Sequence, residues 1–208
     1  MTAADDFSRQ HASRAAIILC GGPSRRMGRP KHELMFGDRT AIERIVDALL
    51  PLVSEVVIVK SADQPLEIRG NVTIVNDEVP AQGPLEGMRT GWTAIAPTVT
   101  AVFVGSCDLP LLEGPVVEKL FASLGEWDAV VPIDEGHQHG LCAVYAAGTQ
   151  AHIRKLRQAD ERRVSALLEQ LTVNWIPTKQ FMEGDPALNS FLNVNTPADY
   201  AEAQARLG

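Results

Sequence analysis

The sequence has few cysteines, few aromatic residues and no long apolar stretch. Its three cysteines, Cys20, Cys107 and Cys142, lie far apart and form no C-x-x-C pair, so their spacing indicates neither a disulfide framework nor a zinc site. No stretch approaches the roughly 18 apolar residues of a membrane helix. Met1 to Arg14 is polar and lacks the core of a secretory signal. We expect a disordered leader there, a single domain over residues 15–208, and a cytoplasmic protein.

Positive charge is also scarce. The 19 Lys and Arg residues against 26 Asp and Glu residues give a net charge of -7. Proteins that bind nucleic acid or anionic membranes usually present a strongly basic face, so we expect neither kind of partner. With 45% hydrophobic and 22% charged residues, the composition is that of a soluble globular protein that buries a core without cross-links.

Short apolar runs recur along the chain. Ala15–Cys20 is partly β-branched and is stopped by two glycines, which is typical of a strand buried on both faces of a parallel sheet. Further runs of this kind are Val56–Val59, Val72–Val75, Thr100–Val104, Ala129–Val131, Cys142–Tyr145 and Val173–Ile176. Between them a 3.6-residue period, as in Ile42–Leu50 and Val116–Leu124, predicts amphipathic helices. The alternation predicts an α/β fold with three α/β/α layers and a Rossmann-like, mostly parallel, twisted sheet, whose ligands bind at the carboxyl ends of the strands.

A basic, glycine-containing segment follows the first apolar run. In Gly21–Lys31, glycine lets the backbone approach an anion while Arg25, Arg26 and Lys31 neutralise it. The spacing matches neither the G-x-x-x-x-G-K-[ST] nor the G-x-G-x-x-G motif. In an acidic chain this local reversal of charge predicts a phosphate-binding loop, and a solvated turn is the alternative interpretation.

Two aspartates follow expected strands, Asp77 after Val72–Val75 and Asp108 after Thr100–Val104. We expect both to face the same crevice at the carboxyl edge of the sheet. As an alternative, Asp108 caps a helix that starts with Pro110 and Leu111. A pair of carboxylates beside a phosphate loop favours Mg²⁺, which prefers one or two carboxylates together with phosphate oxygens.

Two further segments carry polar or glycine groups near expected element ends. Gly83 and Gly87 bracket a turn before a helix, where backbone amides can meet a nucleotide, although a plain turn is the alternative. Asn193 and Asn195 alternate along an expected strand and offer oxygens to a metal or donors to a phosphate. Thr196 and the proline after it predict the cap and first turn of the last helix.

In combination, these motifs resemble the molybdenum cofactor guanylyltransferases, within the larger nucleotidyltransferase group. The resemblance covers Ala15 to Leu207 and implies a fold of the nucleotide-diphospho-sugar transferase type. Its motifs are Leu19-Cys20-Gly21-Gly22, Arg25-Arg26-Met27-Gly28, Lys31, Asp77, Gly83-Pro84-Leu85-x-Gly87, Cys107-Asp108-x-Pro110, His139–Tyr145 and Asn193-Val194-Asn195-Thr196-Pro197. The chain departs from the family pattern at Cys20, where Ala is commoner, at Gly140, where Pro is usual, and at Pro30, where Asp is frequent.

The resemblance also implies a role for individual residues. Catalytic roles are implied for Arg25, Arg26, Lys31 and Asp108. Nucleotide contacts are implied for Leu19, Cys20, Gly21, Gly22, Lys31, Asp77, Gly83, Gly87 and Asp108. We expect Asp108 and Asn195 to hold Mg²⁺, and His139, Arg162, Arg163 and Asn193 to lie toward the pterin substrate. For Arg162 and Arg163, at an expected helix start, the alternative is a surface helix with Arg–carboxylate pairs.

The activity implied is Mg²⁺-dependent transfer of GMP from GTP to the phosphate of molybdopterin bearing molybdenum, with release of pyrophosphate. GTP and molybdopterin are then the small-molecule partners, and transient contacts with other molybdenum cofactor biosynthesis proteins are expected by analogy. The same phosphate loop would serve a cytidylyltransferase or a sugar-phosphate nucleotidyltransferase. A non-catalytic nucleotide-binding regulator is a further alternative, although phosphate capture alone needs no metal-binding carboxylate such as Asp108.

Overall fold

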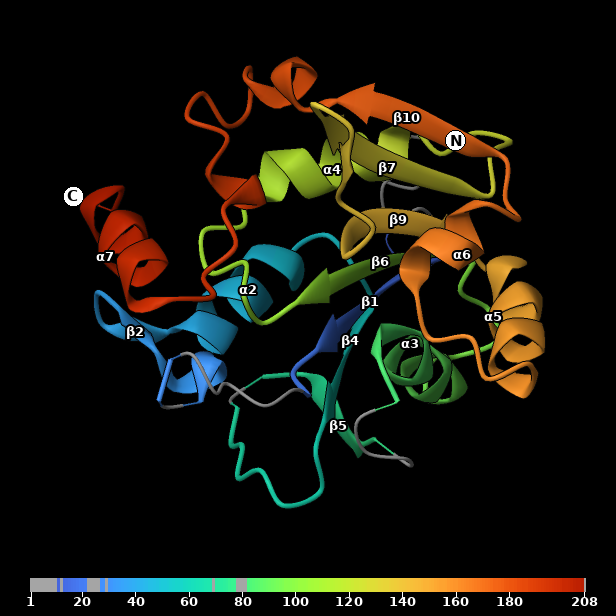
Figure 1. The fold of residues 1–208 in the computed structure, drawn as a ribbon, viewed down its shortest axis with the longest axis horizontal. Coiled ribbons are helices and arrows are strands. Elements are labelled where there is room, and N and C mark those ends of the chain that lie inside the picture. Colours follow the sequence, from blue (N-terminus) through green and yellow to red (C-terminus); the bar gives the residue numbers. More distant parts are fainter. Residues whose placement is uncertain are drawn as a thin grey trace.

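The computed structural model describes residues 11, 13–21, 27–28, 30–68, 70–77 and 82–207. Within them, an eight-stranded sheet has the order β10-β7-β9-β6-β1-β4-β5, with β8 paired to β7 (Figure 1). Its strands are β1 (Arg14–Leu19), β4 (Glu55–Lys60), β5 (Val72–Asn76), β6 (Ala101–Ser106), β7 (Ala129–Asp134), β8 (His137–Gln138), β9 (Cys142–Ala146) and β10 (Val173–Pro177). Each apolar run singled out from the sequence coincides with one of these strands, except that Cys20 and Thr100 lie one residue outside β1 and β6. The sheet is mostly parallel, and β9 runs antiparallel to β6 and β7.

Helices cover both faces of the sheet, which confirms the three-layer prediction. On one face lie α2 (Ala41–Leu49) and α4 (Gly114–Ala122), and on the other lie α3 (Pro84–Thr93), α5 (Thr149–Gln158) and α6 (Val164–Leu168) (Figure 1). Alternate residues of β1 enter the two cores, since Ile18 packs with the α2 side and Ile17 with the α3 side. None of the helices in the described ranges has the length and apolarity to span a membrane.

A small third core lies beside the sheet and was not predicted. It joins a hairpin of β2 (Met35–Phe36) and β3 (Arg39–Thr40) to the last helix, α7 (Pro197–Ala205). The Tyr200 hydroxyl and the Gln204 amide both donate to the Met35 carbonyl, at 2.7 and 2.5 Å. The last helix is therefore fixed against the chain that follows Lys31. Three short 3-10 helices complete the described elements: η1 (Lys31–Glu33), η2 (Thr178–Phe181) and η3 (Asn189–Phe191).

The structure corrects several boundaries. Arg14, expected to end the leader, is the first residue of β1, while residues 1–10 and 12 lie outside the described residues. Asp108 does not cap a helix, because α4 begins only at Gly114 with Glu113 as its N-cap. The segment with Asn193 and Asn195 is not a strand.

The predicted starts of two late helices are confirmed. Thr196 caps α7 in a capping box, in which its side chain accepts from Asp199 N while the Asp199 carboxylate accepts from Thr196 N. This reciprocal arrangement satisfies backbone donors that a helix N-terminus otherwise leaves without partners. Arg163 is the N-cap of α6, so the expected helix start at Arg162 and Arg163 is also confirmed.

Two glycines of α3 allow this helix to approach β1 closely. A Cβ atom on Gly91 would lie 2.6 Å from the Cγ2 atom of Ile17, and one on Gly87 would lie 2.9 Å from the Cδ2 atom of Leu19. Ile17 is fully buried and β-branched, so its methyl group cannot rotate away at low cost. The distance between α3 and β1 therefore depends on glycine at both positions.

We expect Gly91→Ala to lower the free energy of unfolding by about 1 kcal/mol or more. Overpacking typically costs about 1–3 kcal/mol, which exceeds the gain of about 1 kcal/mol from better helix propensity. Urea titration would measure the change. Gly148→Ala is the matched control, because a Cβ atom there meets no heavy atom within 4 Å, and we expect it to stay within about 0.5 kcal/mol of the parent. Equal stability of the two variants would contradict the close approach.

Candidate active site

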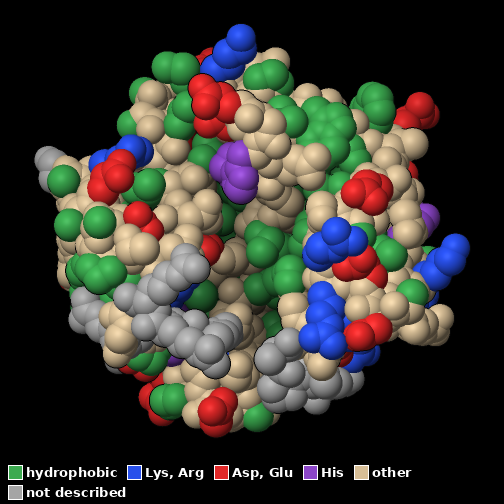
Figure 2. All heavy atoms as spheres, in the orientation of Figure 1, with side chains coloured by type: hydrophobic (Ala, Val, Ile, Leu, Met, Phe, Trp, Pro, Cys, Tyr) green, Lys and Arg blue, Asp and Glu red, His purple; other side chains and the backbone are tan. Residues whose placement is uncertain are grey.

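The carboxyl ends of β1 and β6 lie directly beside each other. The parallel ladder pairs Leu19 with Ser106, and the Cys107 amide donates to the Leu19 carbonyl at 3.0 Å. The expected nucleotide segment Leu19–Gly21 therefore leaves the sheet next to Asp108. Figure 2 shows this side of the molecule hollowed near its middle, with hydrophobic side chains in the hollow and histidine at its rim.

Lys31, Asp108 and Asn195, which are far apart in the sequence, meet at this edge. The Lys31 ammonium donates to the Asn195 carboxamide oxygen at 2.5 Å, and its nitrogen lies 3.8 Å from Asp108 Oδ2. The Lys31 and Asp108 side chains are each 20% exposed, so their charges interact more strongly than those of a fully solvated pair. The structure thus brings together the expected phosphate-binding lysine and both expected metal ligands.

Backbone contacts hold Asn195 in this position. The Val194 amide donates to the Asp108 carbonyl at 2.8 Å, and the Asn195 amide donates to Asp199 Oδ2 at 2.8 Å. Hydrogen bonds from the backbone amides of Asn195 and Thr196, with a smaller contribution from the positive charge of Lys31, lower the pKa of Asp199. Asp199 is therefore ionised at neutral pH and fixes the segment to the start of α7.

The oxygens at this edge suit a hard cation. Asp108 offers a carboxylate that also accepts from the Ser106 hydroxyl, and Asn195 offers a carboxamide oxygen. Within the described ranges, no group of three or more His, Cys, Asp or Glu residues is arranged to hold a metal ion. Mg²⁺ is usually held by one or two carboxylates together with substrate phosphates rather than by an all-protein cage. The Lys31 ammonium beside both oxygens shows that they already attract a cation, so the residues fit Mg²⁺.

The turn before α3 connects this edge to the other side of the hollow. Gly83 is the N-cap of α3 with φ 81°, a conformation that glycine adopts readily. A Cβ atom there would lie 3.0 Å from Arg162 Cβ and 3.1 Å from the Arg162 carbonyl oxygen. The expected nucleotide turn therefore lies against the start of α6, and a side chain at position 83 would require both a strained backbone and a shift of Arg162 by a few tenths of an ångström.

A cavity of about 380 Å³ joins the two halves of the expected site. Asp108, Asn195, His139 and Asn193 all line it. The structure thus places four expected site residues around one space. The family motifs also contribute Pro84, Gly140, Leu141 and Cys142 to the lining, and the further lining residues, which were not expected, are Leu109, His137, Gln138, Val164, Ser165 and Leu168. Arg162 and Arg163, at the start of α6, were expected to lie toward the pterin substrate, whereas the side chains of α6 that line the cavity are those of Val164, Ser165 and Leu168.

His139 is uncharged at neutral pH. Burial, and after it the neighbouring His137, lowers the pKa of His139 to about 4, although Asp134 opposes this shift. Its ring packs edge-on against the His137 ring, with centroids 4.7 Å apart, and lies 5.1 Å from the Phe191 ring. The cavity wall is therefore aromatic and neutral here, which suits a flat heteroaromatic group better than an anion.

Arg162 and Arg163 do not line the cavity. Their side chains are 46% and 70% exposed, and they pair with Asp160 and Glu161 at 3.3 and 2.8 Å. Hydrogen bonds from Arg163, with smaller ones from the Arg162 backbone, lower the pKa of Glu161 to about 2. Such exposed pairs contribute little to stability. The two side chains therefore match the alternative interpretation, a surface helix with Arg–carboxylate pairs.

The remaining expected residues are placed as follows. Asp77 directly follows β5, and its amide donates to the Lys60 carbonyl at 2.7 Å. It therefore lies on the same edge as Asp108, separated from β6 by β4 and β1. Gly22, Arg25 and Arg26 lie outside the described residues.

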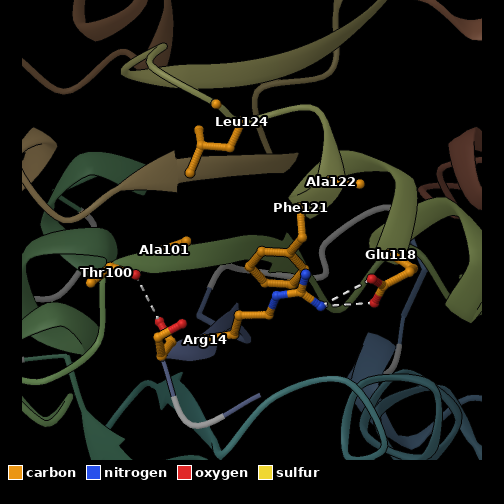
Figure 3. A pocket seen from close by; sticks show the side chains of 9 residues that line it. Arg14, Thr100, Ala101, Glu118, Phe121, Ala122 and Leu124 are labelled. Carbon is orange, nitrogen blue, oxygen red and sulfur yellow. Dashed lines mark hydrogen bonds and ion pairs between the residues drawn. The ribbon is translucent and has the colours of Figure 1, made fainter. Parts of the chain in front are cut away.

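A second cavity, of about 440 Å³, lies at the opposite end of β1 and β6. Figure 3 shows Arg14 there between Phe121 and Glu118. The guanidinium donates to both Glu118 oxygens, at 3.1 and 2.8 Å, and its carbon lies 4.7 Å from the Phe121 ring centroid. Since the cation is already neutralised and stacked, this cavity offers no charge to a phosphate.

Comparison with known proteins identifies the family. A family model described as the MobA-like NTP transferase domain matches residues 16–175. The chain belongs to this family. This MobA-like NTP transferase is 36% identical over 194 residues to a probable molybdenum cofactor guanylyltransferase of Methanothermobacter thermautotrophicus, covering 89% of this chain and 96% of the relative. A protein with the same name from Chloroflexus aggregans is 34% identical over 215 residues, which cover 95% of this chain and 97% of the relative. The predicted membership in the guanylyltransferase family is confirmed, and the MobA-like chain is a nucleotidyltransferase.

Solved structures confirm the fold of this MobA-like transferase. Molybdopterin-guanine dinucleotide biosynthesis protein A from Archaeoglobus fulgidus superposes with a TM-score of 0.78 at 24% identity, covering 92% of this chain and 97% of that protein. A 2-C-methyl-D-erythritol 4-phosphate cytidylyltransferase from Thermus thermophilus gives a TM-score of 0.70 at 16% identity, with 93% and 98% covered. The predicted architecture of the nucleotide-diphospho-sugar transferase type is confirmed.

We expect the stability of the MobA-like protein to fall as the pH drops from about 6.5 to about 4. In this window the unfolded state binds a proton at residue 139 that the folded state, with a His139 pKa of about 4, does not bind, so protonation favours unfolding. One such proton changes the free energy of unfolding by at most about 1.4 kcal/mol per pH unit. Urea titrations at several pH values would show a shallower fall for His139→Gln than for the parent. From pH 7 to 9 the two curves should run parallel, and equal slopes below pH 6.5 would contradict the neutral His139.

Proposed function

We propose that this protein transfers GMP from GTP to the terminal phosphate of molybdopterin bearing molybdenum, releases pyrophosphate and depends on Mg²⁺. The observation that carries the proposal is the single cavity that is lined both by Asp108 and Asn195 and by the aromatic rings of His137 and His139. Relatives named molybdenum cofactor guanylyltransferases, at 34–36% identity over most of the chain, support guanine as the base.

The reaction forms one P–O bond and breaks another. An oxygen of the acceptor phosphate attacks the α-phosphorus of GTP, and the bond from that phosphorus to the β-phosphate oxygen breaks, so pyrophosphate leaves. The second pKa of a phosphate monoester is about 6, so the acceptor is mostly a dianion at pH 7. No side chain needs to remove a proton from it, and catalysis consists of positioning the reactants and neutralising charge.

Lys31 and Asp108 carry the charge chemistry in this proposal. Lys31 bears a mobile ammonium on a long stem, which can exchange its Asn195 contact for phosphate oxygens. Asp108 and Asn195 then offer their oxygens to Mg²⁺, which when bound supplies additional positive charge against the phosphates. Arg25 and Arg26 are the further cations that we assign to the triphosphate and to the departing pyrophosphate.

The other residues position the two substrates. In the proposal, Leu19, Cys20, Gly21 and Gly22 border the guanine nucleotide, together with Asp77, Gly83 and the first turn of α3, which contains Gly87. The acceptor occupies the part of the cavity lined by Asn193, His139 and Ser165, where carboxamide, imidazole and hydroxyl groups donate or accept without adding charge. Arg162, whose backbone lies against the Gly83 turn, and Arg163 are the exposed cations that we assign to the acceptor side.

Nucleotide discrimination tests the proposal directly. With Mg²⁺ and molybdopterin bearing molybdenum, we expect pyrophosphate release from GTP to exceed that from CTP, UTP or ATP by at least about tenfold, because a base is recognised by several hydrogen bonds. Coupled phosphate detection would measure the rate, with acceptor omitted as the control. Preference for CTP would assign the protein to cytosine dinucleotide synthesis, and GTP binding without turnover would favour the regulatory alternative.

Two substitutions with opposite effects test the cation site. Without nucleotide, we expect Asp108→Asn to weaken Mn²⁺ binding at least about tenfold, and Lys31→Met to strengthen it, because the ammonium no longer competes for the oxygens of Asp108 and Asn195. Turnover should fall in both, by about 10²–10³-fold for Lys31→Met. Isothermal titration would measure binding. The matched control is Asp47→Asn, which removes an exposed carboxylate paired with Arg39 at 3.7 Å. Unchanged Mn²⁺ binding in Asp108→Asn would contradict the assignment.

A further inference from the structure

Cys20 and Cys107, far apart in the sequence, are the first residues after the neighbouring strands β1 and β6. The parallel ladder pairs Leu19 with Ser106 and continues through the hydrogen bond from the Cys107 amide to the Leu19 carbonyl, at 3.0 Å. The next pair in this register is Cys20 with Cys107. Neighbouring strands lie about 4.8 Å apart, which falls within the Cα separation of about 4.4–6.8 Å that a disulfide spans.

The two thiols also share one side of the sheet. Cys20 belongs to the apolar cluster under α2 and α4, and Cys107 packs against the same cluster. The neighbouring Cys107 thiol, and after it burial, raise the pKa of the Cys20 thiol. Cys142 belongs to the same cluster, but it lies on β9 opposite Gly105 of β6, and its sulfur donates toward the Ser190 carbonyl oxygen at 3.9 Å. All three cysteines are free thiols in the structure.

We propose that Cys20 and Cys107 form a reversible thiol-oxidation site whose co-reactant is a peroxide. Cys107 reacts first, because it is partly exposed whereas Cys20 is only 3% exposed. Its sulfur attacks the peroxide O–O bond, becomes a sulfenic acid and releases water. The Cys20 sulfur then displaces the hydroxyl group from the Cys107 sulfur, the S–S bond forms and a second water leaves. In total, two thiols and one hydrogen peroxide give one disulfide and two waters, and a reducing dithiol restores both thiols.

The position of this disulfide couples it to the active site. It would link the chain between β1 and Gly21 to the residue that immediately precedes Asp108. A disulfide fixes the S–S distance at about 2.0 Å and the torsion around that bond at about 90°, so its formation reorients the Cys107 side chain and constrains the backbone that presents Asp108 to Lys31. This consequence for catalysis rests on the proposed function, whereas the oxidation itself does not.

The first experiment counts thiols in the full-length protein. After treatment with one equivalent of hydrogen peroxide and denaturation, we expect two of the three thiols to be lost and to return with dithiothreitol. Peptide mapping of the parent protein should recover a single linked pair of peptides, containing Cys20 and Cys107. This mapping needs no variant, so it holds even if a substitution impairs folding. Three persistent thiols, a disulfide that includes Cys142, or a disulfide between two chains would overturn the proposal.

Two serine variants provide matched controls. Cys142→Ser replaces a buried cysteine outside the pair and should still form the dithiothreitol-reversible link. Cys107→Ser should form no link within the chain, although Cys20 and Cys142 are both present. A link in Cys107→Ser would overturn the pairing, because it would require Cys142.

A second experiment measures the coupling to the site. We expect oxidation to weaken Mn²⁺ binding and to lower GTP turnover by about 10²-fold, since displacing a catalytic group by about 1 Å can cost that much. Dithiothreitol should restore both. If the disulfide forms while the reduced protein does not turn over GTP, the proposed function fails and the oxidation site stands. If the reduced protein turns over GTP but the disulfide leaves binding and turnover unchanged, the coupling is overturned.

Discussion

The contact of the Lys31 ammonium with Asn195 and Asp108 joins three parts of the chain that no local interaction would bring together. It requires the exit of β6 to present Asp108, the loop after β1 to return Lys31, and the C-terminal segment to deliver Asn195, whose carboxamide oxygen lies 2.5 Å from the Lys31 nitrogen. The third core supplies the support, because Tyr200 and Gln204 bind the Met35 carbonyl. The hairpin of β2 and β3 and the last helix, α7, lie at the periphery, yet they determine where the Lys31 ammonium lies.

The opposite wall depends on close packing rather than on charge. Glycine at positions 87 and 91 lets α3 approach β1, and this places the Gly83 turn against Arg162. Inside α3, Glu86 is 3% exposed and pairs with Arg89 at 2.7 Å and Arg157 at 2.9 Å. A buried carboxylate is tolerated when it is paired on both oxygens, and here the pairing ties α3 to α5. The hydrogen bonds from Arg89, and after them those from Arg157, lower the pKa of Glu86, so this link persists at neutral pH.

The sequence predicts the main sheet well because each of its longer strands is a compact apolar run, such as Ala15–Cys20. It misses β2, β3 and β8, which have two residues each and carry no periodic signal. Asn193 and Asn195 alternate as in a strand, yet their segment is held by Val194 and Asp199 through single hydrogen bonds rather than by a ladder. The meeting of Lys31, Asp108 and Asn195 is predicted by the order of the family motifs and by the tendency of ligands to bind at the carboxyl ends of parallel strands. The wall formed by His137 and Ser165 depends instead on tertiary packing that no local pattern encodes.

Charge balance explains why so few acidic groups face the cavity of an acidic protein. Asp108 is the one carboxylate among the described residues that line it, and the remaining lining residues are apolar, carboxamide, hydroxyl or imidazole, with His139 neutral at pH 7. In the proposed function, a triphosphate and an acceptor phosphate together bring several negative charges, so each further carboxylate would repel both substrates. A single carboxylate holds a divalent cation only weakly unless phosphate oxygens complete the coordination. For that reaction the arrangement therefore favours a metal ion that binds together with the nucleotide, while the Lys31 ammonium balances the charge of Asp108 in this structure.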